Sequence, residues 1–221
     1  MQKSDSVEKG KAVSDVLDVI LFLSEFIKNK EESINFINQL TSGKTGLIDK
    51  NGKDIFSNTF SIVGNIFGEV LYQNILEKVF NANAPGLIHV DDLKGANGEI
   101  SLSIGDNDPF GLINVGDSNE LIKLCKEHSE LVISDKNFNG SMFDTIGSEK
   151  SSINVLIGSK KFTEGWDCFR VSTMGLMNIG RSEGSEIIQL FGRGVRLRGY
   201  ENCLKRSSAL NNIKLSKEFE N

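Results

Sequence analysis

The feature that most constrains the fold is the alternation of short apolar runs with helical segments between residues 109 and 206. Helices are expected from Ser118, a plausible N-cap, to about His128, and again over Ser185–Phe191. Strands that alternate with helices imply crossover connections and a parallel sheet, which binds ligands at the carboxyl ends of its strands. Three runs have the length of buried strands: Gly111–Val115, Asn154–Ile157 and Val171–Met177.

Residues 1–105 have a different pattern of apolar residues, which predicts helices followed by a hairpin. A turn is expected at Lys50–Lys53, and Gly95–Gly98 is typical of a hairpin turn. That hairpin would join a strand at Leu87–Val90 to an alternating strand at Glu99–Ile104. The helices are expected at 13–27, 31–40 and 61–80, where apolar residues recur every three or four positions.

Composition describes a globular chain of 221 residues with a formal net charge of −5 and a pI near 5.2, which argues against a generically basic nucleic-acid binder. The charge is uneven, because residues 159–206 hold nine lysines and arginines against five acidic residues. Three widely spaced cysteines favour a reducing cytoplasm over a disulfide framework or a metal cluster. The N-terminus lacks the apolar core of a signal peptide, and no apolar stretch is long enough to span a membrane.

The run Thr41-Ser42-Gly43-Lys44-Thr45 resembles the end of a phosphate-binding P-loop, and Asp91-Asp92 resembles metal-binding acids at a strand end. A P-loop needs a preceding strand, an earlier glycine and a following helix. The earlier position is Asn38, the preceding segment is predicted to be helical, and a turn follows. We therefore expect a loop between helices, a solvated pair of aspartates, and structural roles for both histidines, His89 and His128.

The first group of candidate site residues follows the strand expected at Asn154–Ile157. Ser159, Lys160 and Lys161 place a hydroxyl and two ammonium groups at the end of that strand, where they suit a nucleic-acid phosphate. Gly165 and Asp167 follow, and an acid just after a glycine can accept hydrogen bonds from a ribose hydroxyl. Each element also occurs in ordinary solvated loops.

The second group is a pair of arginines set among glycines, in the run Gln189-Leu190-Phe191-Gly192-Arg193-Gly194-Val195-Arg196. The arginine guanidinium is a fixed, charged fork that matches phosphate oxygens. Glycines disfavour helix interiors, so the helix should end near Gly192 and leave Arg193 and Arg196 on one side of a short turn. The alternative is a basic helix C-terminus that complements the helix dipole.

The order of these elements resembles motifs V and VI of superfamily 2 helicases and translocases. Ser159, Gly165 and Asp167 match motif V in spacing, and Gln-x-x-Gly-Arg-x-x-Arg over 189–196 matches motif VI. The amino-acid sequence of residues 109–206 is similar to that of the helicase subunit of Type III restriction enzymes, a DEAD/DEAH-like family. The match covers residues 1–108 more loosely, as a lead-in between two motor domains.

The resemblance implies a RecA-like, P-loop NTPase-like α/β fold: a parallel sheet flanked by helices, with a helical or α+β lead-in. It divides the chain into 1–105, the lead-in, 106–206, the second RecA-like domain, and 207–221, a polar tail. It implies ATP and Mg as cofactors, with the Mg ligands outside this chain. The implied partners are DNA, the N-terminal RecA-like domain and a modification methyltransferase subunit, with no membrane.

The resemblance also implies residue roles: Arg193 would contact the γ-phosphate and Arg196 would be the arginine finger, or the two would share these roles. Gln189 and Gly192 would belong to the nucleotide site, with Asp167 and Gly165 at the ribose. Ser159, Lys160 and Lys161 would contact the DNA backbone. Because no competent P-loop or DEAD-like motif and no nuclease motif is present, we expect the second half of a motor. The alternative function is a non-catalytic nucleic-acid- or phosphate-binding module.

Overall fold

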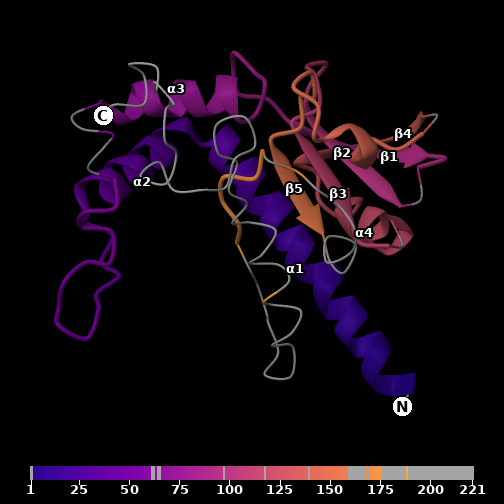
Figure 1. The fold of residues 1–221 in the computed structure, drawn as a ribbon, viewed down its shortest axis with the longest axis horizontal. Coiled ribbons are helices and arrows are strands. Elements are labelled where there is room, and N and C mark those ends of the chain that lie inside the picture. Colours follow the sequence, from indigo (N-terminus) through magenta and orange to yellow (C-terminus); the bar gives the residue numbers. More distant parts are fainter. Residues whose placement is uncertain are drawn as a thin grey trace, which may run out of the picture. The chain divides into compact units, whose positions relative to one another are not determined.

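The computed structural model describes residues 2–60, 63, 66–96, 98–116, 118–138, 140–158, 168, 170–175 and 188, with side chains from residue 13 onward. The chain divides into two compact units, Met1–Glu164 and Gly165–Asn221. The helices and strands named below all belong to the first unit (Figure 1).

Three helices form most of the N-terminal half: α1 (Gln2–Lys28), α2 (Lys30–Ser42) and α3 (Gly68–Lys78). The apolar spacing that predicts a helix over 13–27 corresponds to buried residues of α1, among them Val13, Leu17 and Ile20. Helix α3 starts later than the predicted 61–80, with Phe67 in extended conformation just before it. Helices α2 and α3 lie side by side (Figure 1).

The ends of α1 and α2 are closed by side chains and turns. Buried Tyr72 of α3 donates its hydroxyl to the carbonyl of Ile27, 2.6 Å away, which satisfies a carbonyl left without a partner in the last turn of α1. Ser33 of α2 donates to the carbonyl of Phe26. These bonds tie the three helices together at one point.

Over the residues that the structure describes, the sheet has five strands in the order β4-β1-β2-β3-β5. Strand β1 (Ile88–Lys94) pairs antiparallel with β2 (Glu99–Ile104) and parallel with β4 (Leu131–Asn137). Strand β3 (Gly111–Asn114) pairs antiparallel with β2 and parallel with β5 (Val155–Gly158). Four strands therefore share one direction and β2 alone is reversed.

The expected α/β fold is confirmed, and the sheet is mixed because the predicted hairpin, β1 and β2, belongs to the same sheet as β3, β4 and β5. The turn that joins β1 to β2 is too short for a crossover, and so is the connection from Ile104 to Gly111, so β2 must run against both neighbours. The sheet joins strands from both sides of residue 105. The division of the chain into 1–105, 106–206 and 207–221 stays a prediction.

Several predicted elements of residues 106–206 can be compared with the structure. The strands predicted at 111–115 and 154–157 are confirmed as β3 and β5, and the helix from Ser118 is confirmed as α4 (Ser118–Cys125). The strand predicted at Val171–Met177 is wrong for residues 171–175, which are irregular. Of the helix predicted at 185–191, the structure describes Ile188, which is helical.

The main core lies between one face of the sheet and helices α1 and α4. Alternate residues of the strands enter it, including Ile88 and Val90 of β1, Ile100 and Leu102 of β2, and Ile113 of β3. Leu121 and Cys125 of α4 and Ile20 of α1 complete the contact. Leu93 and Leu112, which point to the opposite face, are buried but lie outside this cluster.

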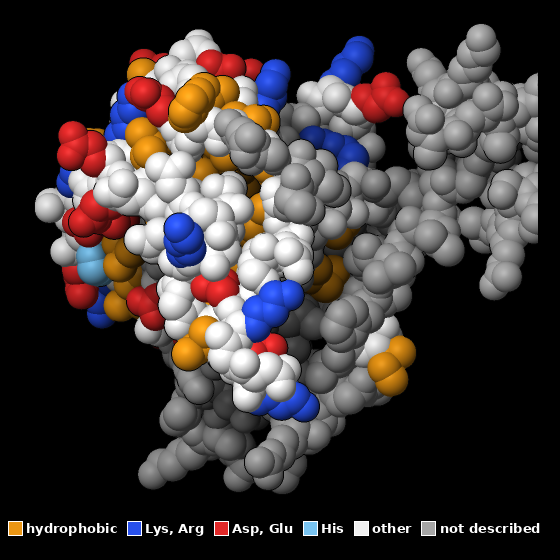
Figure 2. Space-filling view, turned by 90° about the vertical axis from the view of Figure 1, so that its left-hand side faces the viewer, with side chains coloured by type: hydrophobic (Ala, Val, Ile, Leu, Met, Phe, Trp, Pro, Cys, Tyr) orange, Lys and Arg blue, Asp and Glu red, His pale blue; other side chains and the backbone are white. Residues whose placement is uncertain are grey.

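None of the described helices is both long and apolar enough to cross a bilayer. The face drawn in Figure 2 carries lysine, aspartate and glutamate side chains, with hydrophobic side chains exposed between them.

Candidate functional site

The predicted site residues lie outside the described residues. This holds for Ser159, Lys160, Lys161, Gly165 and Asp167 of the first group. It holds equally for Gln189, Gly192, Arg193 and Arg196. The structure therefore brings none of them together and separates none of them. It does describe the strand that leads to the first group.

That strand is β5, which pairs in parallel with β3 so that Gly158 lies opposite Asn114. Because β1, β3, β4 and β5 run the same way, their carboxyl ends lie along one edge of the sheet, here called the carboxyl edge. In α/β sheets this is the edge where ligands bind. Ser159 is the residue that follows Gly158 in the chain.

The backbone packs tightly where the β1–β2 hairpin meets the end of β3 at the carboxyl edge. Gly98 has a φ of +75°, and a Cβ atom added to it would lie 2.2 Å from the carbonyl oxygen of Gly116. A residue other than glycine is therefore excluded by the backbone conformation and by space. The hairpin turn fixes the backbone that follows β3.

One face of the sheet carries polar side chains that the sequence reading did not expect to be buried. Asp91 is fully buried, and one of its carboxylate oxygens lies 2.7 Å from Nζ of Lys136. No hydrogen bond of ordinary geometry reaches that oxygen from the described residues, so the ion pair is its compensation. Ser134 of β4 donates to the other oxygen.

Asp92 is also buried, on the opposite side of β1 from Asp91. It forms an ion pair with Lys94, which also lies 3.5 Å from the carboxylate of Asp135 on β4. The hydrogen bond to Asp92 raises the pKa of Lys94 above its usual value, against an opposing effect of desolvation. The expectation of a solvated pair of aspartates is therefore wrong, because both side chains are buried where β1 pairs with β4.

Glu99, the first residue of β2, is fully buried and acts as an acceptor at the carboxyl edge. One carboxylate oxygen accepts the hydroxyl of Ser141, and the other accepts the backbone N–H of Met142 at 2.8 Å. The loop that follows β4 is therefore held against the start of β2. A short 3-10 turn, η2 (Phe143–Thr145), continues from this anchor.

The alternation of residues in the hairpin strands is the signal that could have revealed this polar face. Glu99, Ser101 and Ser103 share one side of β2, and His89 and Asp91 share the facing side of β1. Reading both strands together predicts a polar face and a face that is apolar except for Asp92. The two residues Asp91 and Asp92, considered without the rest of the hairpin, do not predict these faces.

The P-loop-like run spans the end of α2 and the start of the connection to α3, so the expected loop between helices is confirmed from Gly43 onward. Gly43 takes a left-handed conformation after α2, and the N–H of Lys44 donates to the carbonyl of Gln39 at 2.9 Å. The next residues are organised by Asp54. Its carboxylate accepts the N–H and hydroxyl of Thr45, at 2.6 and 2.9 Å, and the N–H of Gly46. No strand precedes Gly43 and no helix follows Lys44 directly.

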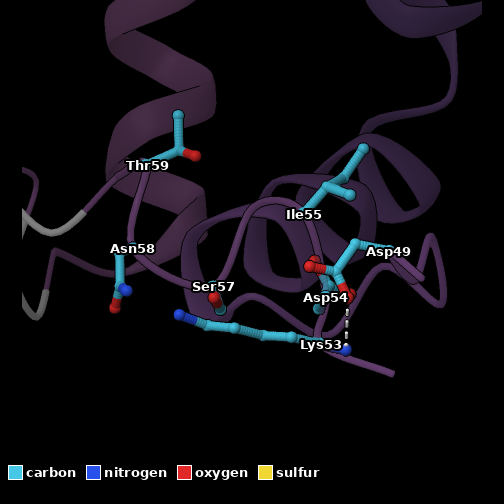
Figure 3. A pocket seen from close by; sticks show the side chains of 7 residues that line it. All are labelled: Asp49, Lys53, Asp54, Ile55, Ser57, Asn58 and Thr59. Carbon is cyan, nitrogen blue, oxygen red and sulfur yellow. Dashed lines mark hydrogen bonds between the residues drawn. The ribbon is translucent and has the colours of Figure 1, made fainter. Parts of the chain in front are cut away.

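An open hollow of about 370 Å³ lies on this loop (Figure 3). Asp49 and Asp54 line it, but both carboxylates accept hydrogen bonds from their own loop. The backbone N–H groups of Lys53 and Asn51 lower the pKa of Asp49. Burial acts to raise the pKa of Asp54, but its hydrogen bonds outweigh this and lower it. The carboxylates stabilise the loop and leave no preformed ligand set.

The histidines and Cys125 were the remaining candidates for a chemical role. His89 lies on β1 and His128 follows α4, where its Nδ1 is 3.7 Å from a Glu130 carboxylate. Burial raises the pKa of the Cys125 thiol to about 11, so this thiol is a poor nucleophile. In the part of the chain that the structure describes, no three His, Cys, Asp or Glu side chains group as metal ligands.

Comparison of the chain with protein-family models, with curated proteins and with solved structures finds no match.

Proposed function

We propose that this chain is the second RecA-like domain of an ATP-dependent DNA helicase or translocase, of the kind found in Type III restriction enzymes. The observation that carries the proposal is the position of β5. Among the described residues β5 is an edge strand in parallel pairing with β3, and it ends one residue before Ser159. In open α/β sheets ligands bind at the carboxyl ends of the strands, so Ser159 follows β5 at the edge that the proposal assigns to ligand.

The proposed mechanism divides the work between two domains. The partner domain supplies the P-loop and the Mg ligands, since the Lys44 run is a helix end. Water attacks the γ-phosphorus while the bond to the β–γ bridging oxygen breaks, which yields ADP and phosphate. Arg193 and Arg196 would stabilise the charge on the transferred group, and Asp167 would accept from the ribose.

DNA would bind through the first group of residues. Ser159, Lys160 and Lys161 would contact backbone phosphates just beyond the end of β5, and Gln189 would link the nucleotide site to this contact. The excess of cations in residues 159–206 supports a phosphate-facing surface on an otherwise acidic chain.

The first test measures ATP hydrolysis by the 221-residue chain with and without duplex DNA. We expect negligible turnover in both cases, and DNA-stimulated turnover when the chain is part of the complete motor. Robust hydrolysis by the isolated chain would contradict the proposal, because it would require a P-loop within these residues.

The second test separates the motor from a non-catalytic binding module. In the complete protein, Lys160→Ala with Lys161→Ala should weaken DNA binding and reduce its salt dependence. The double variant makes fewer phosphate contacts, so its binding releases fewer counterions. Lys123→Ala with Lys126→Ala, two exposed lysines of the α4 region, is the matched control. DNA binding that depends on Arg193 and Arg196, with no effect of nucleotide in any protein form, would favour the binding module.

A further inference from the structure

The loop after α2 exposes aliphatic side chains on a well-ordered frame. Ile48 forms a β-bridge with Asp54, and the N–H of Ile55 donates to the carbonyl of Leu47 at 2.9 Å. Leu47 and Ile55 are therefore cross-strand neighbours on one side of a small hairpin, here called the 44–55 loop. Their side chains are 57% and 53% exposed.

The 44–55 loop presents positive charge around this apolar pair. Lys44, Lys50 and Lys53 are all exposed. The two aspartates of the loop accept hydrogen bonds from its own backbone, as Figure 3 shows for Asp49 and the N–H of Lys53. These aspartates keep their charge, so the loop carries three lysines against two aspartates and has a net charge of +1.

A second apolar feature of the chain has the opposite charge. Where α1 meets α2, a hollow of about 140 Å³ is lined by Phe22, Phe26 and Phe36, with Glu25 and Glu32 at its rim. Phe22 is 56% and Phe36 is 44% exposed, and both glutamates are exposed. This feature is called the α1–α2 groove.

The groove suits the loop in size and in chemistry. An apolar cavity of about 150 Å³ accommodates a group of benzene size, so the groove can take one aliphatic side chain. Lysines around the inserted group would face glutamates around the groove, which is the arrangement of complementary charges that selects partners. Among the described residues nothing fills either feature, as the exposure of Ile55 and Phe36 shows.

The loop and the groove of one chain are held apart. Phe36 and Gly43 are seven residues apart on α2, a rise of roughly 10 Å. The 44–55 loop then continues away from α2 and from the sheet (Figure 1). A loop in this position can reach the groove of a second chain.

We propose that the 44–55 loop of one copy inserts Ile55 into the α1–α2 groove of a second copy. Each copy carries one loop and one groove, so a two-fold axis closes a dimer with two identical contacts. The association uses surfaces remote from the carboxyl edge and does not depend on the proposed motor function.

The test measures the mass of the 221-residue chain by sedimentation velocity over a range of concentrations. We expect a dimer whose dissociation constant rises more than about tenfold in Ile55→Asp and in Phe36→Asp, because a charge would replace an inserted apolar group. Leu87→Asp is the matched control, since Leu87 is a 42% exposed aliphatic residue before β1. It should dimerise like the natural chain.

A mixture of the two variants tests directly whether the loop and the groove contact each other. Ile55→Asp keeps a working groove and Phe36→Asp keeps a working loop, so an equimolar mixture should form heterodimers through one intact contact while each variant alone stays monomeric. Lys50→Glu should weaken the dimer, and Glu32→Lys in the same chain should restore part of it. Circular dichroism confirms that each variant is folded.

Three results would overturn the proposal. The natural chain could remain monomeric up to about 1 mM, the weakest association of interest. Dimerisation could survive both Ile55→Asp and Phe36→Asp, which would assign it to another surface. The mixture of the two variants could stay monomeric, which would show that the loop and the groove do not meet.

Discussion

The two faces of the sheet are built by different rules. On one face, Ile100 and Leu102 of β2 pack with helices α1 and α4 in a continuous apolar core. On the other face the same strand carries Glu99, Ser101 and Ser103, all buried. One strand of six residues therefore serves an apolar and a polar interior by alternation alone.

The difference shows what each face can contribute. The apolar face gains free energy from removing hydrocarbon from water, without a need for exact partners. The polar face has to satisfy each buried group, and it does so with contacts between elements distant in sequence, such as Asp91 with Lys136 and Glu99 with Ser141. It gains less stability and fixes the register and the loops at the carboxyl edge.

The largest expected effect breaks the apolar face. Leu102→Ala should lower the free energy of unfolding by about 2–5 kcal/mol, because it leaves a cavity in the core. Ser101→Ala, its neighbour on the polar face, should cost less than about 1 kcal/mol. Urea denaturation of both variants measures the contrast, and equal losses would mean that the two faces do not differ in this way.

The next effect concerns the buried carboxylate. Lys136→Ala should cost about 1–3 kcal/mol, since it leaves Asp91 buried without its cation. The value lies below that for a fully buried pair because the Lys136 side chain is 54% exposed. Lys126→Ala, on the surface after α4, serves as the control and should change stability by less than about 0.5 kcal/mol. A loss as small as in the control would show that Asp91 needs no counter-charge.

A smaller and more local effect is expected at Glu99. Glu99→Gln weakens two charge-assisted hydrogen bonds and should cost about 1–2 kcal/mol. Hydrogen exchange should accelerate at the amide of Met142 and its neighbours before any change appears in the core of β2. Unchanged protection of Met142 would contradict the anchoring role.

The smallest effect lies outside the sheet, in the 44–55 loop. The pKa of Asp54 is lowered in the folded chain, so its contribution is present above its ordinary pKa of 3.8 and is lost as the pH falls below that value. Exchange of the Thr45 and Gly46 amides should therefore rise at low pH while the sheet stays protected. Asp54→Asn should remove this pH dependence, and a loop that opens equally in both forms would have another cause.

The sequence predicts local features of the fold well. Strand β5, helix α4 and the buried face of α1 follow from apolar periodicity, and the hairpin turn before Glu99 follows from its glycines. The direction of β2 also follows from that turn. The shared direction of β3, β4 and β5 follows from the alternation of strands and helices after residue 109, but their union with the hairpin in one sheet does not.

The burial of Asp91 and Asp92 could not be read from their own positions. It depends on β4, forty residues later, whose Ser134, Asp135 and Lys136 come into register with β1. The alternation of residues along a strand predicts which face of the sheet a side chain is on. It does not predict which residue of another strand will contact it. The rejection of the P-loop at Gly43, by contrast, needed only local sequence, namely Asn38 at the earlier glycine position and a turn in place of the following helix.

The most direct measurement of the proposed function is ATP turnover by the complete motor carrying Arg196→Ala. The account predicts that turnover falls by about 10³–10⁵-fold while ATP binding is largely retained, as expected for an arginine finger. Lys44→Ala, the matched change at the helix end that resembles a P-loop, should leave turnover unchanged. Unchanged turnover in Arg196→Ala would contradict the account.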